Sequence, residues 1–194
     1  MQKNEIVVVE KPETVSWEEI SAVLRQAHAR NDQQGIVSRY PHLPPDQLQQ
    51  QVEGHGGKLF VALDAGRVVG TGAVIRVEKE LWCHHGSYAY CFLDAVLPAY
   101  AGKGIFRRIE ACQQQQARAW GEKYLLLDTD ERNRNMLRIC WRMGYRPIEY
   151  RMRDDHNSVV FVKSLGPKMP SRLYCLQLFL RIRWKRRKKA RAGS

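Results

Sequence analysis

Two glycines, Gly102 and Gly104, lie where a β-favouring segment gives way to an amphipathic helical pattern. The segment before them ends at Pro98, and the helical pattern begins at Ile105. The first turn of a helix leaves backbone N–H groups without partners, and the helix dipole makes this end attractive to anions. Glycine has no Cβ to hold a phosphate away, and it accepts positive φ angles. The spacing therefore predicts a loop that binds a pyrophosphate.

Two other phosphate-binding motifs do not fit this loop. A dinucleotide-binding fingerprint would need a third glycine at position 107, where the chain has Arg107. A Walker A loop needs Ser or Thr after its lysine, and Lys103 is followed by Gly104. Neither a dinucleotide-binding protein nor a P-loop enzyme is expected.

Acidic residues within two apolar segments are candidates for a general base. Asp94 lies inside the segment that precedes the glycines, and regular alternation would place it on the strand face of Tyr90 and Phe92. Burial there would raise its pKa toward useful values, whereas an ion pair or a bond to a loop amide would give it a structural role. Asp128 and Asp130 end the next apolar segment and are the next candidates.

Hydrophobic periodicity and turn residues divide the chain into helices and strands. The expected helices span residues 17–30, 44–52, 105–120 and 133–143. The expected strands span residues 6–9, 59–63, 67–77, 88–97, 124–128, 145–152 and 159–163. Strand–helix alternation with antiparallel hairpins at both ends predicts an α/β domain with a mixed sheet over residues 1–165. An apolar-then-basic extension, residues 166–194, follows it.

Two helices allow more detailed expectations. Ser16 and Glu19 have the spacing of a capping box at the start of the first helix. The inward stripe of the third helix is expected to contain Ile105, Ile109, Cys112 and Trp120. The glutamines at 113–116 are expected to lie mostly outside this stripe.

Cysteine usage argues against a disulfide framework or a zinc site, because the number is odd and no pair has Cys-x-x-Cys spacing. The cysteines are Cys83, Cys91, Cys112, Cys140 and Cys175. Their apolar surroundings are typical of reduced core thiols, and no metal is expected. No stretch has the length and apolarity of a signal peptide or a membrane span, so the sequence predicts a cytoplasmic protein.

Positive charge is concentrated at the end of the chain. The net charge is +12, and residues 181–194 contain eight Lys or Arg and no acid. Without these eight the net charge is +4, so the body is only mildly basic. Beside apolar residues such as Phe179 and Trp184, this tail favours a peripheral contact with the anionic inner face of a membrane, or else is an ordinary solvated end. Nucleic-acid binding is less favoured, because the body has no basic helix or aromatic stripe.

The order of these features resembles the GNAT-type N-acetyltransferase superfamily over residues 58–150. The matching residues are Val96, Pro98, Gly102, Gly104, Asn133, Gly144 and Tyr145. The acyl-CoA signature of that superfamily begins with Arg or Gln, and this chain has Ala99 there. The resemblance implies a mixed, mostly antiparallel splayed sheet flanked by helices. In such a fold the strands at 88–97 and 124–128 separate around the thioester of acetyl-CoA.

The resemblance also implies roles for particular residues. Backbone amides of Gly102, Lys103, Gly104 and Ile105 would hold the pyrophosphate of acetyl-CoA. Backbone groups of Val96 and Leu97 would bind its pantetheine arm, and one of these amides would polarise the thioester. Asn133 would contact the cofactor arm, act as a helix N-cap, or do both.

Cys140 occupies the position where the superfamily often has a tyrosine that protonates the leaving thiolate. A thiol with a pKa of about 8.5 could serve as this acid, but a small core thiol is the commoner fate of such a residue. Water, Tyr145 or Tyr150 could take its place.

The implied function is acetyl-CoA-dependent N-acetylation of a small-molecule or sugar amine. Acceptor specificity would come from residues 35–48, which include Tyr40 and His42, and from residues 81–88. The long C-terminal extension is similar to that of bacterial acetyltransferases of polysaccharide biosynthesis. The alternatives are a non-catalytic acyl-CoA-binding module, suggested by Ala99 and Cys140, and a nucleic-acid-binding protein that acts through its tail.

Overall fold

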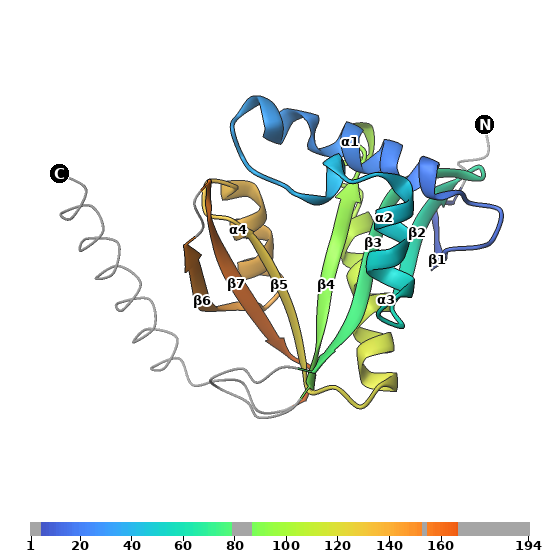
Figure 1. Ribbon diagram of the computed structural model, residues 1–194. Coiled ribbons are helices and arrows are strands. Elements are labelled where there is room, and N and C mark those ends of the chain that lie inside the picture. The colour runs from blue at the N-terminus through green and yellow to red at the C-terminus, as the bar shows by residue number, and fades with distance from the viewer. Residues whose placement is uncertain (1–4, 79–86, 153–154, 167–194) are drawn as a thin grey trace.

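The computed structural model describes residues 5–78, 87–152 and 155–166, which form an α/β unit built on a seven-stranded sheet (Figure 1). The strands are β1 (Val7–Glu10), β2 (Lys58–Asp64), β3 (Arg67–Glu78), β4 (Ser87–Val96), β5 (Tyr124–Asp130), β6 (Arg146–Met152) and β7 (Asn157–Ser164). The α-helices are α1 (Trp17–Gln33), α2 (Pro45–Glu53), α3 (Ile105–Ala119) and α4 (Arg134–Arg142), and the 3-10 helices are η1 (Tyr40–His42) and η2 (Pro98–Tyr100). Every expected helix and strand is confirmed, with ends that differ by three residues at most.

The sheet is split along its centre. Its strand order is β1-β2-β3-β4-β5-β7-β6, and every neighbouring pair is antiparallel except β4 and β5. These two run parallel and pair only through Ala89 with Leu125 and Tyr90 with Leu126. Beyond these pairs the strands diverge toward their carboxyl ends (Figure 1). The mixed, mostly antiparallel and splayed sheet is therefore confirmed.

A bulge in β4 decides which way Asp94 points. Opposite Gly72 of β3, β4 carries both Leu93 and Asp94, and Leu93 has a φ of 56°. The extra residue ends the regular alternation of side chains. Phe92 packs against η1 on one face, whereas Asp94 accepts a hydrogen bond from Gln113 of α3 on the other. The expectation that Asp94 shares the face of Phe92 is wrong, because that alternation assumes a regular strand.

Helices cover both faces of the β2–β4 half of the sheet. α1 and α2 lie on one face and α3 on the other (Figure 1). The capping box of α1 is confirmed: the Glu19 N–H donates to Ser16 Oγ at 3.2 Å, and the Ser16 N–H donates to Glu19 Oε2 at 2.9 Å. This cap fixes where α1 begins, and thereby which of its residues lie over β4.

The inward face of α3 is more polar than expected. Its buried residues are Ile105, Ile109, Glu110, Gln113 and Ala117. Cys112 and Trp120 pack at the edge of the core and remain half-buried. The glutamine run lies mostly outside the stripe, as expected, except for Gln113, whose buried side-chain NH₂ group donates to β3 and β4.

Cys91 and Cys140 are buried free thiols and Cys112 is a half-buried one, which confirms the expectation of reduced core thiols for these three. Within the described residues, no helix is long and apolar enough to cross a membrane. Cys83, Cys175, most of the loop expected at 81–88 and nearly all of the extension 166–194 lie outside the described residues. The membrane contact of the tail therefore stays a prediction.

Candidate acetyl-transfer site

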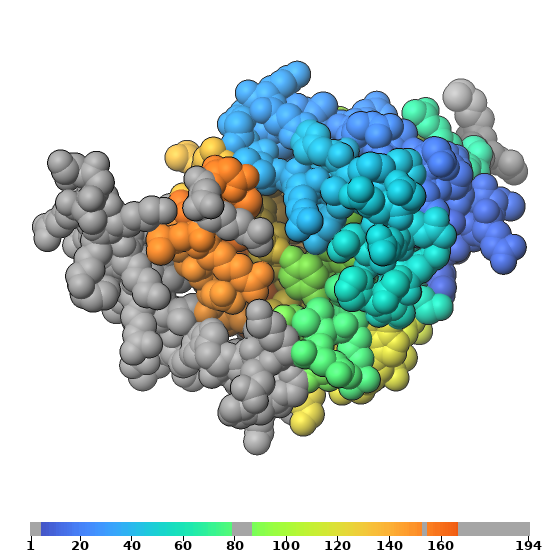
Figure 2. Space-filling model, viewed as in Figure 1, coloured from blue at the N-terminus to red at the C-terminus, as the bar shows by residue number. Residues whose placement is uncertain are grey.

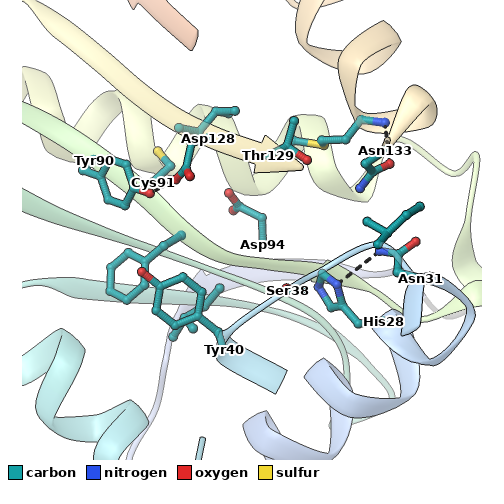
Figure 3. A pocket seen from close by; sticks show the side chains of 15 residues that line it. His28, Asn31, Ser38, Tyr40, Tyr90, Cys91, Asp94, Asp128, Thr129 and Asn133 are labelled. Carbon is teal, nitrogen blue, oxygen red and sulfur yellow. Dashed lines mark hydrogen bonds between the residues drawn. The ribbon is translucent and has the colours of Figure 1, made fainter. Parts of the chain in front are cut away.

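A pocket opens where β4 and β5 separate. It is lined by α1, by the segment that joins α1 to η1, by β4 and β5, and by the start of α4, and its cavity volume is about 130 Å³. Figure 2 shows the surface hollowed between the light-blue segment that follows α1 and the orange strands β6 and β7. In Figure 3, Asp94 lies between Asp128 and Thr129 of β5 on one side and Tyr40 and His28 on the other.

The carboxyl group of Asp94 is oriented from α3. Gln113 Nε2 donates to Asp94 Oδ1 at 2.8 Å and to the Ala73 carbonyl at 3.0 Å, so two acceptors fix the amide. Burial raises the pKa of Asp94 from 3.8 to about 8; the Gln113 hydrogen bond opposes this rise, and the nearby Glu110 adds to it. A carboxyl group that titrates close to neutral pH is well suited to accept a proton from a reacting group.

Gly72 provides the space for this arrangement. A Cβ at Gly72 would lie 2.5 Å from Asp94 Oδ1, 2.5 Å from Ile109 Cγ2 and 2.9 Å from Gln113 Nε2. The absence of a side chain at this position therefore lets the carboxyl group, the amide and α3 meet above β3.

We expect Gly72→Ala to destabilise the fold by about 1–3 kcal/mol and to lower turnover, because the added methyl group must displace Asp94 or α3. Thermal unfolding and steady-state kinetics measure the two effects. Thr71→Ala is the control in the same strand. The buried hydroxyl of Thr71 has no hydrogen-bond partner among the described residues, so its removal should lower the unfolding free energy by less than Gly72→Ala does. An unchanged melting temperature for Gly72→Ala would contradict the tight packing.

His28 connects α1 to the bulge. Its ring hydrogen-bonds to the backbone of Asp94, and Asn31 Nδ2 lies 3.3 Å from His28 Nδ1. Burial lowers the pKa of His28 more than the Asp94 backbone raises it, so the ring is neutral near pH 7. Because Asn31 donates to Nδ1, the neutral ring carries its proton on Nε2. His28 thus holds the wall of the pocket and brings no positive charge into it.

Asp128 faces Tyr90 across the opening between the strands. The Tyr90 hydroxyl donates to Asp128 Oδ1. Burial and the Asp128 charge raise the pKa of Tyr90 well above its usual value, so the tyrosine remains protonated and continues to donate. Both residues line the pocket, and Asp128 is half-buried.

Asp130, the other acid of β5, has a structural role. Arg132 forms a bidentate ion pair with it, with Nη2 to Oδ2 at 2.5 Å, and the Val37 N–H donates to Oδ2 at 2.9 Å. Burial alone would raise the pKa of Asp130, but the hydrogen bonds from Arg132 and Val37 outweigh it and lower the pKa. The segment after α1 is thereby tied to the end of β5, which closes one side of the pocket.

The predicted anion-binding loop has the expected backbone. Gly102 and Gly104 have φ angles of 77° and 75°, and a Cβ on either would meet nothing within 4 Å. Gly104 is the N-cap of α3, and no side chain caps this end of the helix. The loop therefore leaves open space in front of the first-turn N–H groups, as a phosphate site requires.

Lys103 and its neighbours brace the loop. Lys103 Nζ lies 4.5 Å from the centre of the Tyr100 ring, and the Tyr100 hydroxyl donates to Asp64 Oδ2 at 2.7 Å. This chain of contacts ties the loop to the β2–β3 hairpin and keeps one ammonium group beside the glycines. Ala99 is exposed in η2 and carries no polar side chain.

The other cofactor candidates lie at the end of β4 and at the start of α4. The Leu97 N–H donates to the Val69 carbonyl at 2.9 Å and is committed to the sheet, so the predicted pantetheine contact rests on Val96. Asn133 Oδ1 accepts from the Met136 N–H at 3.0 Å, which confirms the N-cap. Asn133 also lines the pocket, so capping and a cofactor contact are compatible.

Cys140 is on the buried side of α4, within the core, and it does not line the pocket. Its side chain is 1% exposed, and burial raises the pKa of its thiol to about 12. Tyr145 is fully buried and donates to Glu110 Oε1, and Tyr150 donates to Glu131 Oε2. The structure thus brings Asp94, Asp128 and Asn133 into the pocket and leaves these three proton donors outside it.

We expect Cys140→Ala to lower stability by about 1–3 kcal/mol, the usual cost of a small core change, and to leave turnover per folded molecule unchanged. Chemical denaturation gives the first quantity and initial rates the second. A loss of turnover of about a hundredfold at an unchanged melting temperature would instead show that the thiol is the general acid.

Sequence reasoning did not identify His28, Asn31 or Gln113 as site residues, because all three lie on helices amid other polar residues. One signal was available. Gly70 and Gly72 interrupt an otherwise apolar strand, and glycine within a strand marks a close approach by another element. Here that element is α3.

Comparison with known proteins agrees with this geometry. The model of the acetyltransferase (GNAT) family matches residues 17–145. An acetyltransferase of the GNAT family from Staphylococcus aureus Mu50 superposes with a TM-score of 0.65 at 14% identity, covering 84% of this chain and 100% of its own. The protein yncA from Salmonella typhimurium, solved with its cofactor acetyl-CoA, gives 0.62 at 12% identity, covering 86% of this chain and 98% of its own.

An aminoglycoside 6'-acetyltransferase type Ii gives a TM-score of 0.64 at 13% identity, covering 84% of this chain and 99% of its own. No significant match was found among curated proteins. At such identities the structures establish the fold, while the family model spans about two thirds of the sequence and includes the pocket and the glycine loop. The chain belongs to the acetyltransferase (GNAT) family.

Proposed function

We propose that this acetyltransferase moves the acetyl group of acetyl-CoA to the amine of a small molecule or sugar. One observation carries the proposal: the buried carboxyl group of Asp94 lies on β4 beside the pocket, and the chain that leaves β4 runs through η2 into the uncapped, glycine-bearing start of α3. A phosphate-bearing thioester and a base are thus held by the same stretch of chain, as acyl transfer to an amine requires.

The loop fits the pyrophosphate of acetyl-CoA. Gly102 and Gly104 leave open space where a Cβ would stand, and the backbone amides of Gly102, Gly104 and Ile105 are the donors that would hold it. The Lys103 N–H already donates to the Tyr100 carbonyl at 3.4 Å. Val96, next to the split in the sheet, and Asn133, at the start of α4, would contact the pantetheine arm. This arrangement directs the thioester into the opening between β4 and β5.

Asp94 is the proposed base of the transfer. The amine nitrogen attacks the thioester carbonyl carbon, a C–N bond forms and the C–S bond breaks. The carboxylate of Asp94 takes the proton that the nitrogen gives up, and the sulfur departs as a thiolate that water protonates. Gln113 holds the carboxyl group in place, and the raised pKa makes the carboxylate a stronger base than an exposed aspartate.

Release of free thiol from acetyl-CoA with a panel of amines tests this function. We expect thiol to appear only when an amine is present, in equal amount to the acetylated amine. Binding of acetyl-CoA without release of thiol for any amine would point instead to a non-catalytic acyl-CoA-binding module. A role in polysaccharide biosynthesis stays a prediction from the resemblance of the C-terminal extension.

A further inference from the structure

Among the described residues that line the pocket, the charged side chains are all acidic. This feature rests on the proposed function and deepens it, because it indicates which class of amine the site accepts. Two carboxyl groups, those of Asp94 and Asp128, line the pocket. Within the described part of the chain, no lysine or arginine side chain lines it. Its remaining polar lining consists of hydroxyl, amide and imidazole groups.

Asp128 has capacity for a further partner. Its Oδ1 accepts from Tyr90, and its Oδ2 accepts no hydrogen bond from any residue that the structure describes. A half-buried carboxylate with an unused oxygen is best satisfied by a charge-assisted donor such as an ammonium group. In Figure 3 the carboxyl group of Asp94 points toward β5, where Asp128 lies.

Two arginines near the pocket, Arg132 and Arg151, are already paired. Arg151 of β6 acts electrostatically on Asp128, but its guanidinium forms two hydrogen bonds of 3.2 Å with Glu149. Arg132 is bound to Asp130. An acceptor that carries a carboxylate would therefore lose its hydration and find no cation within the described lining, which is costly in a confined site.

The shape of the pocket limits the rest of the acceptor. The cavity of about 130 Å³ is comparable to one that holds a benzene-sized molecule. Tyr40 and Phe92 form an aromatic wall, with ring centres 5.2 Å apart. A narrow methylene chain can lie against this wall with polar groups at each end.

We propose that the acceptor is a small organic dication, a primary amine that bears a second positive charge and no carboxylate, with Asp128 binding the second charge. The acceptor amine is presented to Asp94, and the remaining ammonium group is held by Asp128 Oδ2. Both ends of the acceptor thus bind in the pocket where the acetyl group is transferred, and Asp128 decides which amines that pocket accepts.

The test compares matched acceptors of two to five methylene groups. At each length a terminal diamine, a monoamine and an ω-amino acid are assayed for kcat/KM with acetyl-CoA, and calorimetry measures their binding to the protein–CoA complex. We expect the best diamine to exceed the amino acid of equal length by about a hundredfold and the monoamine by about tenfold. Asp128→Asn should bring the diamine-to-monoamine ratio close to one, whereas Asp46→Asn, an exposed change on α2, should not alter it.

The outcomes separate this inference from the proposed function. Preferential binding of diamines without release of thiol would support the acceptor class and contradict catalysis. Amino acids that react or bind as well as diamines at every length would overturn the acceptor class while acetyl transfer stands. Absence of binding by every amine in the series would also overturn it.

Discussion

Gly104→Glu is expected to abolish measurable binding of acetyl-CoA. The new carboxylate would stand in the open space in front of the α3 N-terminus, against the pyrophosphate and at a position with a φ of 75°. Juxtaposed like charges cost several kcal/mol, and each 1.4 kcal/mol is a tenfold change, so the affinity should fall by at least about a hundredfold. Isothermal titration calorimetry with acetyl-CoA measures this loss.

Two control variants separate charge from backbone strain. Gly104→Ala adds the strain of a left-handed alanine, about 1–2 kcal/mol, without the charge. Gly121→Glu places the same side chain at another exposed glycine of positive φ, beyond the far end of α3, where nothing lies within 4 Å. We expect both controls to bind acetyl-CoA. Undiminished affinity in a folded Gly104→Glu protein would remove the basis for the loop assignment.

Asp94→Asn is expected to lower kcat by about 10²–10⁴-fold, the range of a lost general base, and to leave the affinity for acetyl-CoA nearly unchanged. In the unmodified protein kcat/KM should rise with pH through about 8, as Asp94 ionises. The asparagine variant should lack this transition. If Asp128→Asn loses the transition and Asp94→Asn keeps it, then Asp128 is the base.

The same variant has a stability signature. An aspartate in the unfolded chain has a pKa of about 3.9, whereas burial raises the pKa of Asp94 in the folded protein to about 8. The folded state therefore binds more protons between these values, and stability falls as pH rises through this window. Asp94→Asn removes that penalty, so its unfolding free energy should decline less between pH 5 and pH 9 than that of the unmodified chain. Denaturant titrations at the two pH values test this independently of catalysis.

Local sequence patterns were sufficient to predict the helices and strands. The capping box at Ser16 and the glycines before α3 act within a few residues, and each was confirmed. The split between β4 and β5 was predicted through the family resemblance and is not visible in either strand alone. Asp94 was identified as an anomaly, since an acid in an apolar strand needs a specific environment.

What sequence could not predict depends on contacts between distant segments. The bulge at Leu93 turns Asp94 to the other face of β4. The Asp94 carboxyl group fits there only because Gly72, in the neighbouring strand, has no side chain. Gln113 is buried because its amide reaches the β3 backbone and Asp94, although the helix alone gives it no reason to point inward. His28 contributes to the pocket only because α1 lies over β4.

The central claim is that one chain binds acetyl-CoA at the β4–α3 loop and delivers its acetyl group to an amine beside Asp94. Its most direct test incubates the protein with acetyl-CoA deuterated in the acetyl group and a diamine acceptor, and follows free thiol and labelled product together by mass spectrometry. We predict one labelled N-acetyl product for each thiol released, with Gly104→Glu and Asp94→Asn both deficient. Thiol release without labelled amine, or equal product from all three proteins, would contradict the account.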